Sequence, residues 1–498
     1  RSTLSSSSAA SDVYKRQHQY IILYFIIKGV HVKMERKNVW TVSDAAKKEM
    51  IFKFCEDYKK YISDCKTERE CAAEAVKIAE NAGYRDLKKV IAENGKLKAG
   101  DKVYACHMGK TLALFNIGKE PLENGMKILG AHIDSPRIDV KQNPLYEDSD
   151  MALLDTHYYG GIKKYQWVAL PLAMHGVVAL KDGRTVNVVI GEDMNDPVLG
   201  VTDLLIHLAA EQMEKKGAKV VEGENLDVLI GSIPEKEDDK KDDKEAKESV
   251  KAAMLRIFKE KYGIEEEDFF SAELEIVPAG PARDYGMDRS MIMGYGHDDR
   301  VCAYTSLIAM LDVKDVDKTS VCLLVDKEEI GSVGATGMHS KFFENMVAEV
   351  LNCLGDYSEI KLRRALTNSK MLSSDVSAAF DPLYAAAFEK KNAAFLGRGM
   401  VFNKFTGSRG KSGSNDCNAE FLGELRSTLE KHEVNYQSAE LGKVDVGGGG
   451  TIAYILAQYG MEVVDSGIPV LSMHAPWEIV SKADVYETML GYKAFLIG

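Results

Sequence analysis

Two adjacent glutamates, Glu328 and Glu329, stand where an apolar run ends, and a glycine, Gly331, follows them. The run Ser320–Val325 has the length and the boundaries of a buried strand, and catalytic groups in α/β folds commonly follow such strands. Two like charges side by side in a protein interior are costly unless a proton or a cation offsets them. The pair therefore suggests a metal site or a carboxyl group of raised pKa. A solvated strand end is the alternative, and the pair alone does not decide between them.

Four more polar groups follow strand-like apolar segments. They are His132, Asp298, Asp375 and His474, which follow residues 126–131, 291–296, 370–372 and 468–473. Because the carboxyl ends of neighbouring strands in an open α/β sheet line one crevice, residues distant in sequence can meet there. Imidazoles and carboxylates are the ligands typical of a pair of divalent ions, zinc foremost, with cobalt or manganese as alternatives. Each residue alone has a structural explanation, such as a helix cap at Asp298. Together the strand ends favour a metal centre.

Alternating strands and helices are expected around these strand ends. Helical patterns occupy residues 43–62, 68–82, 301–311, 340–354 and 482–495, and further strands are expected at residues 102–107 and 111–117. This alternation predicts a three-layer α/β/α domain with a mainly parallel sheet, formed by residues 34–137 and 287–498.

Residues 138–286 have a different pattern of apolar and polar residues. Short alternating segments, such as residues 177–180 and 186–190 around the turn Asp182-Gly183, predict an inserted, mainly β and partly antiparallel domain. A helix over residues 201–216 is expected to pack on it. The charged run at residues 235–248 is expected to be a solvated loop or a frayed helix.

The overall composition limits the class of protein. A chain of 498 residues that is 45% hydrophobic has material for two domains. Its net charge of -12 argues against nucleic-acid binding and against binding to anionic membranes. The eight cysteines contain no CxxC pair, which is typical of reduced thiols in a cytoplasmic protein. The expected partners are small molecules, peptides or copies of the chain itself.

The first 33 residues are expected to be a non-native or untranslated leader. Residues 1–17 are rich in serine and alanine, and the apolar run at residues 20–27 is too short to span a membrane. A signal peptide is the alternative, but no small-x-small cleavage site follows the apolar run. We expect residues 18–33 to be upstream sequence that precedes a start at Met34.

In order and spacing, these motifs resemble those of the M18 aminopeptidases, the aspartyl aminopeptidase family of dinuclear metallopeptidases, and in particular the bacterial aminopeptidase 1 type. The motifs are His132-x-Asp134, Tyr159-Gly160-Gly161, Asp298-Asp299, Glu328-Glu329-x-Gly331, Ser374-Asp375, residues 447–451 and Met473-His474. The resemblance extends over nearly all of residues 34–498. It implies hydrolysis of the N-terminal bond of peptides, and a closed homo-oligomer, a dodecamer, to which the inserted domain contributes contacts.

The resemblance also implies how two metal ions would be held. Asp298 would bridge the ions, His132 and Asp375 would complete one site, and Glu329 and His474 would complete the other.

Two acidic residues would serve the chemistry without binding metal. Glu328 would take a proton from a water held between the ions and deliver it to the leaving amine, as general base and acid. Asp134 would accept the free ring N–H of His132, with a helix or turn cap as its alternative role.

Three positions bear on substrate preference. Lys404 falls near a lysine that the family pairs with an acidic substrate side chain, and His207 falls where the inserted domain offers a histidine to a neighbouring subunit. Aspartyl members carry a histidine three residues after the aspartate ligand, whereas this chain has Ala378. The loss of a pocket donor puts a strict acidic preference in doubt.

Other functions are alternatives to a metal-dependent aminopeptidase. The glycine run at residues 447–450 lacks a P-loop ending, so a turn near a substrate carbonyl fits better than a nucleotide site. A related dinuclear amidohydrolase, such as a deacylase or carboxypeptidase, could use the same metal ligands. A non-catalytic metal-binding assembly protein is the alternative from another class.

Overall fold

The computed structural model describes residues 36–235, 249–408 and 413–498. The expectations for residues 1–33 and for residues 236–248 of the charged run therefore lie outside the described residues. Residues 38–498 form one compact unit that contains three sheets. None of the helices in the described part of the chain is both long enough and apolar enough to cross a membrane.

The largest sheet has nine strands with a parallel centre. Their order is β1 (Arg85–Asp86), β2 (Lys102–His107), β3 (Thr111–Asn116), β13 (Ser320–Val325), β4 (Lys127–His132), β14 (Lys370–Ser374), β18 (Glu462–Gly467), β16 (Met400–Asn403) and β17 (Tyr436–Ala439). The four strands from β13 to β18 pair in parallel, whereas β3 is antiparallel to both of its neighbours and β16 is antiparallel to β18. The expected mainly parallel sheet is thus confirmed at its centre.

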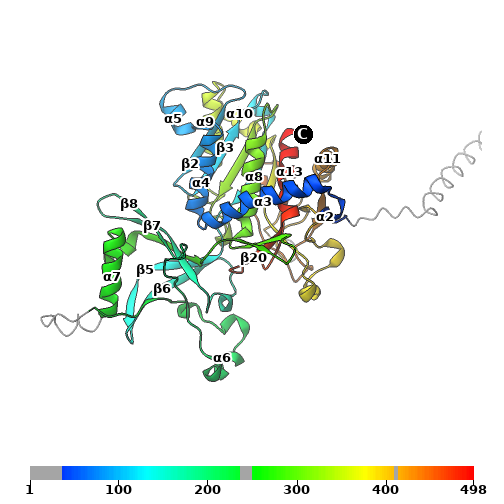
Figure 1. Cartoon of the computed structure of the whole chain (residues 1–498). Helices are drawn as coiled ribbons and strands as arrows, with labels where there is room; N and C mark the ends of the chain where they lie inside the picture. Colours follow the sequence, from blue (N-terminus) through cyan, green and yellow to red (C-terminus); the bar gives the residue numbers. More distant parts are fainter. Residues whose placement is uncertain (1–35, 236–248, 409–412) are drawn as a thin grey trace, which may run out of the picture. The chain divides into compact units, whose positions relative to one another are not determined.

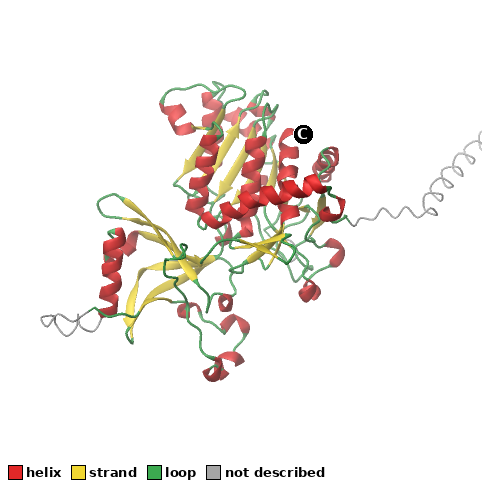
Figure 2. Ribbon diagram, in the orientation of Figure 1, coloured by secondary structure: helices red, strands yellow, loops and turns green. Residues whose placement is uncertain are grey.

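Helices cover both faces of this sheet (Figures 1 and 2). One face packs against α3 (Ala45–Asp64), α4 (Glu68–Asn81), α8 (His297–Asp312), α11 (Ala419–Lys431) and α13 (Lys482–Ile497). The other packs against α5 (Leu87–Ala92), α9 (Phe342–Cys353), α10 (Glu359–Thr367) and α12 (Ala453–Ala457). Alternate residues of β13 enter opposite cores, Leu323 on the second face and Leu324 on the first. The three-layer α/β/α architecture is therefore confirmed.

Local capping explains where the first helices begin. A single turn, α2 (Val39–Val42), precedes α3, whose N-cap Asp44 accepts a hydrogen bond from Lys47 N at 2.8 Å. Helix α4 begins with a capping box in which Thr67 and Glu70 satisfy each other's main-chain N–H groups. Both helices lie where the sequence predicts them.

The second sheet has six strands and lies within residues 137–278. Its order is β8 (Thr185–Ile190), β7 (Leu172–Ala179), β10 (Ala272–Pro278), β5 (Arg137–Asp148), β6 (Met151–Tyr159) and β9 (Val228–Gly231). Every neighbouring pair is antiparallel. The predicted hairpin is β7–β8, and α7 (Ser249–Tyr262) packs against the core of this sheet.

The helix predicted over residues 201–216 is wrong. The structure has only a short 3-10 turn, η3 (Ile206–Leu208), followed by the five-residue helix α6 (Ala210–Glu214). The large apolar residues at the centre of this segment, such as Leu204 and Leu205, are consecutive and exposed. They therefore offer no single stripe that a longer helix could bury.

The third sheet was not expected. Its five strands are β11 (Arg283–Tyr285), β12 (Met291–Gly294), β20 (Glu478–Ser481), β19 (Pro469–Leu471) and β15 (Ser377–Ala378). The sequence predicts strands β12 and β19, which precede Asp298 and His474, in the main sheet; this is wrong, because both pair with β20 in this separate sheet.

Candidate metal centre

The structure brings the predicted ligands together in three overlapping groups. The groups are His132, Asp298 and Asp375; His132, Glu328 and Glu329; and Asp298, Glu329 and His474. Within each group the candidate ligand atoms lie within 4.8 Å of one another.

Two sheets position these side chains. His132 ends β4 and pairs with Val325 of β13, while Asp375 directly follows β14, the strand on the other side of β4. Asp298 is the second residue of α8, which follows β12, and His474 follows β19; both of these strands belong to the five-stranded sheet. The cluster therefore lies between the carboxyl ends of the parallel strands and the third sheet.

Asp298 faces both histidines. Its Oδ1 lies 3.2 Å from His132 Nε2, and its Oδ2 lies 3.1 Å from His474 Nε2. A carboxylate that directs one oxygen toward each imidazole has the arrangement needed to bridge two cations.

Main-chain carbonyl groups fix the tautomer of each imidazole. His132 Nδ1 lies 3.0 Å from the carbonyl oxygen of Asp134, and His474 Nδ1 lies 3.0 Å from that of Gly161. A carbonyl oxygen only accepts, so each Nδ1 carries the proton and donates it. Each Nε2 faces Asp298 at the centre of the cluster, and once it has lost any proton to a bound metal it would offer its lone pair as a ligand.

The carboxylate of Asp134 lies beside His132 and holds the turn that carries the two glutamates. Its Oδ1 lies 3.3 Å from His132 Nδ1, and its two oxygens accept the main-chain N–H groups of Glu328 at 3.1 Å and Glu329 at 3.2 Å. It therefore supports an imidazole and caps the 3-10 turn η8 (Glu328–Ile330) at once. Burial raises the pKa of Asp134, but its interactions with His132 and Tyr159 outweigh burial and hold the pKa below its usual value.

The buried charges of the cluster call for a cation. Burial, reinforced by neighbouring carboxylates, raises the pKa values of Glu329 and Asp375 well above the usual range. Asp298 Oδ1 and Glu329 Oε1 are buried and have no hydrogen-bond partner among the described residues. A divalent cation would offset these charges and bind these oxygens, and two imidazoles with carboxylates suit zinc.

Glu328 lies at the edge of the cluster. Its Oε2 is 3.8 Å from His132 Nε2, and its side chain remains 16% exposed, against 4% for Glu329. Burial raises the pKa of Glu328 to about 7. A carboxyl group with this pKa can both take up and release a proton near neutral pH.

Comparisons with known proteins agree with this chemistry. The family model described as aminopeptidase I zinc metalloprotease (M18) matches residues 61–496. The chain belongs to the M18 family. It is 64% identical over 462 residues to a probable M18 family aminopeptidase 1 of Clostridium acetobutylicum, which covers 93% of this chain and 98% of that protein. The M18 chain is thus a zinc metalloaminopeptidase.

Solved structures of M18 proteins share the fold. The crystal structure of the Thermotoga maritima M18 aminopeptidase matches with a TM-score of 0.87 and 43% identity, covering 93% of this chain and 99% of that chain. Aminopeptidase I from Clostridium acetobutylicum matches with a TM-score of 0.86 and 62% identity over the same shares of the two chains. The yeast mApe1 dodecamer matches with a TM-score of 0.71 at 19% identity, covering 89% of this chain and 96% of that chain, which shows likeness of fold.

Two acidic residues support this M18 centre in roles that the sequence did not predict. Glu478 of β20 is buried and accepts the main-chain N–H groups of Asp298 at 2.9 Å and His474 at 2.6 Å. Asp299 accepts the main-chain N–H of His132 at 3.3 Å. A glutamate in the apolar strand β20, four residues after His474, was the available signal for the first.

The structure does not bring the two predicted specificity residues into the metal cluster. His207 lies exposed in η3, and Lys404 lies exposed directly after β16. Ala378 is half-buried in β15, where it pairs with Val470 of β19.

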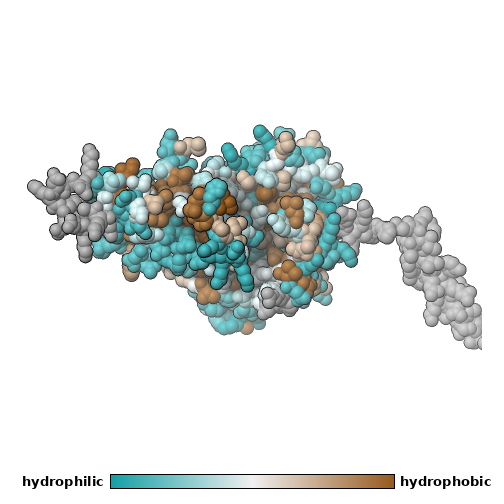
Figure 3. Space-filling view, turned by 90° about the horizontal axis from the view of Figure 1, so that it is seen from below, coloured by the Kyte–Doolittle hydropathy of each residue, from teal (hydrophilic) through white to brown (hydrophobic). Residues whose placement is uncertain are grey.

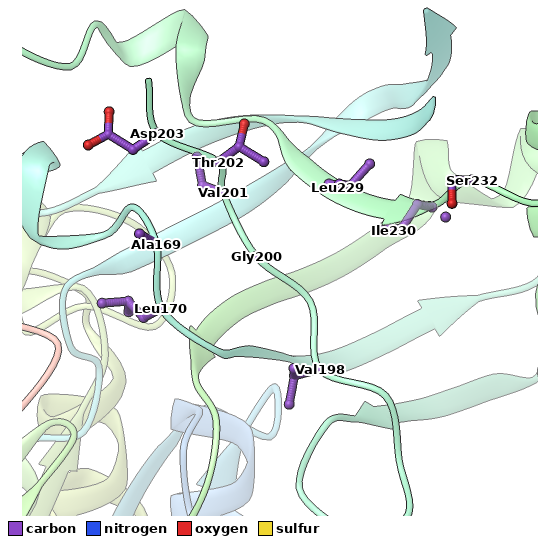
Figure 4. A pocket seen from close by; sticks show the side chains of 11 residues that line it. Ala169, Leu170, Val198, Gly200, Val201, Thr202, Asp203, Leu229, Ile230 and Ser232 are labelled. Atoms are coloured by element: carbon purple, nitrogen blue, oxygen red, sulfur yellow. The ribbon is translucent and has the colours of Figure 1, made fainter. Parts of the chain in front are cut away.

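A surface pocket of about 610 Å³ lies away from the chemistry of the M18 centre. Figure 4 shows its lining, which comes from loops and strands of the six-stranded sheet around Ala169, Gly200, Asp203 and Leu229. None of the metal-cluster residues lines this pocket.

Proposed function

We propose that this chain hydrolyses the N-terminal peptide bond of peptides at this cluster, with Glu328 as the residue that moves the proton. The observation that carries the proposal is the placement of Glu328. Its carboxyl group lies beside His132 at the edge of the cluster, its main-chain N–H is held by Asp134, and its pKa is raised to about 7. It is therefore held in place while its carboxyl group can exchange a proton.

The ligand set that we propose holds two zinc ions. Asp298 would bridge them, His132 and Asp375 would complete one site, and Glu329 and His474 would complete the other. The two oxygens of Asp298 facing the two imidazoles support this division. Zinc at such sites polarises a carbonyl oxygen and lowers the pKa of water.

In the proposed reaction, Glu328 accepts a proton from the water that attacks the scissile carbonyl carbon. The same carboxyl group then donates this proton to the leaving amine nitrogen as the C–N bond breaks, which returns Glu328 to its charged form. Asp134 holds the main-chain N–H of Glu328 and thereby keeps the carboxyl group near the substrate.

Substitution of Glu328 tests the proposal. Glu328→Gln should lower kcat about 10²–10⁴-fold on aminoacyl chromogenic substrates, and zinc content should stay at the wild-type level. Glu329→Gln is the matched control and should lose zinc, because this side chain is a proposed ligand. Peptides with a blocked N-terminus should be poor substrates. Equal turnover of blocked and free peptides, or full activity of Glu328→Gln, would contradict the proposal.

A preference for acidic N-terminal residues is the finer part of the proposal. Lys404 would pair with the substrate carboxylate, while Ala378 offers no donor. Lys404→Gln should lower the ratio of kcat/KM for a glutamyl substrate to that for an alanyl substrate. An unchanged ratio would leave Lys404 without a role in specificity.

We also propose that residues 138–286 form a separate domain that makes contacts between copies of the chain in the cytoplasm. The six-stranded sheet has a core of its own, which supports the division from residues 34–137 and 287–498. Leu204, Leu205, Ile206 and Leu208 are all exposed, and they follow Asp203, which lines the pocket of Figure 4. Figure 3, viewed from the side of α6, shows hydrophobic groups on this face. Exposed apolar surface of this kind is typical of protein contacts.

A closed dodecamer, in which His207 of this apolar segment approaches the site of a neighbouring copy, is the assembly that we propose. Leu205→Asp combined with Ile206→Asp should lower the mass measured by analytical ultracentrifugation. An unchanged mass would show that this face does not hold the assembly together.

A further inference from the structure

The Tyr159-Gly160-Gly161 motif has no role in the reaction described above, yet each of its residues contacts the metal centre. The Tyr159 hydroxyl donates to Asp134 Oδ2 at 2.8 Å. Gly160 lies so close to Glu329 that an added Cβ would be 3.3 Å from Glu329 Oε2. The Gly161 carbonyl oxygen accepts from His474 Nδ1 at 3.0 Å.

This motif comes from the six-stranded sheet, because Tyr159 is the last residue of β6. A sheet that supplies none of the proposed ligands therefore reaches two of them, Glu329 and His474, and the neighbouring Asp134 through the end of β6. Each of the three sheets in the described residues therefore has a residue at or next to the centre.

The Tyr159 hydroxyl completes the hydrogen bonding of a buried carboxylate. Asp134 is fully buried, and its Oδ2 accepts both the Tyr159 hydroxyl and the main-chain N–H of Glu329. Its Oδ1 accepts the N–H of Glu328 and lies 3.3 Å from His132 Nδ1. Loss of the hydroxyl would leave Oδ2 with a single donor and free the carboxylate to turn.

Arg137 holds the Tyr159 ring from the neighbouring strand. The two residues pair across β5 and β6, and the guanidinium carbon lies 3.8 Å from the ring centroid. Arg137 is itself held by Asp139 at 2.7 Å, by Glu275 at 3.2 Å and by Glu68 at 3.5 Å. Because Glu68 belongs to α4, this support connects the six-stranded sheet to a helix of the main layer.

We propose that Tyr159 is a positioning residue for the metal centre, which acts by orienting Asp134 and through it His132 and the turn that carries Glu328. The inference rests on the proposed function, since it takes His132 as a zinc ligand and Glu328 as the proton carrier. Arg137 fixes the ring that carries the hydroxyl. The six-stranded sheet thereby contributes to zinc retention without supplying a ligand.

The test is Tyr159→Phe in the zinc-loaded protein, with Tyr158→Phe as the matched control. Tyr158 is the preceding residue of the same strand and is 42% exposed. Competition with a chelator measures zinc affinity, and steady-state assays at saturating zinc separate kcat from KM. Tyr159→Phe should lower zinc affinity about 10–100-fold and should lower kcat with KM unchanged, whereas Tyr158→Phe should behave as wild type.

Arg137→Lys provides a second variant, because lysine keeps the charge but lacks the planar group that stacks on the ring. It should weaken zinc binding in the same direction. Wild-type zinc affinity and kcat in Tyr159→Phe would overturn the inference. A lower melting temperature with unchanged zinc affinity would overturn it as well. These outcomes are distinguishable from failure of the proposed function, which is decided by Glu328→Gln in the wild-type background.

Discussion

The Nδ1 atom of His474 lies 3.0 Å from the carbonyl oxygen of Gly161, so an imidazole carried by the five-stranded sheet depends on a main-chain atom at the end of the six-stranded sheet. The direction of this carbonyl group depends on the preceding residue, Gly160, which has a φ of 76°. A side chain at this position would meet both a strained backbone and a proposed metal ligand.

Gly160→Ala should therefore weaken zinc binding and lower activity. The new Cβ would lie 3.3 Å from Glu329 Oε2 and 3.4 Å from Glu329 Cβ, so the glutamate would have to shift. The positive φ adds strain of about 1–2 kcal/mol. Chelator competition and kcat/KM measure the two effects.

Gly183→Ala separates the strain from the contact. Gly183 has a φ of 87° in the β7–β8 turn, and an added Cβ there would have no heavy atom within 4 Å. This variant should lose a similar amount of stability while it keeps wild-type zinc affinity. If both alanine variants bind zinc equally well, close packing of Gly160 against Glu329 is not needed by the centre.

The number of zinc ions bound should follow the position of each ligand. His474→Ala should lose one equivalent of zinc, because His474 is proposed to bind only one ion. Asp298→Asn should lose both, because its two oxygens face the two imidazoles. Elemental analysis of protein dialysed against trace zinc gives the stoichiometry, and equal losses in the two variants would argue against a bridging role for Asp298.

Glu478 should be needed for the arrangement of Asp298 and His474 although it is not itself a proposed ligand. Its two oxygens accept the main-chain N–H groups of Asp298 and His474, and glutamine would keep only one acceptor oxygen. Glu478→Gln should lower zinc affinity about 10–100-fold. A variant that retains wild-type affinity in chelator competition would show that one of the two hydrogen bonds is sufficient.

The sequence predicted the central layer and the residues of the candidate metal cluster because both leave local signals. Apolar runs such as Ser320–Val325 mark buried strands, and the N-cap Asp44 marks the beginning of α3. Three of the proposed ligands lie at or just after the ends of strands of the parallel sheet, so their convergence followed from the rule for parallel sheets. His132, Glu329 and Asp375 meet in this way at β4, β13 and β14.

The remaining features depend on contacts between distant residues. Strands β12 and β19 are only three or four residues long and reach each other through β20, so no local pattern reveals that they form a sheet of their own. Glu478 lies 180 residues from Asp298, whose N–H it accepts. Tyr159 supports Asp134 from the six-stranded sheet, 25 residues further along the chain.

A buried ionic cluster between the N-terminal end of α4 and the six-stranded sheet predicts a pH-dependent stability. His175 of β7 places Nδ1 2.8 Å from Glu70 and Nε2 3.0 Å from Glu192, and Lys66 lies 2.6 Å from Glu192. Burial lowers the pKa of His175, but the hydrogen bonds to Glu192 and Glu70 outweigh burial and raise the pKa above its usual value.

His175 should therefore stabilise the fold at acidic pH and contribute less as pH rises. The unfolded histidine has a pKa of about 6.5, so the stabilisation is fully present below that pH and is lost as pH rises through the higher folded pKa. Urea unfolding of the wild type and of His175→Gln at several pH values between 5.5 and 9 measures the difference. Both proteins keep the same metal centre, so the difference between their free energies of unfolding does not contain the pH dependence of that centre. The difference should shrink with rising pH, and a difference that stays constant or grows would show that the protonated imidazole does not stabilise this contact.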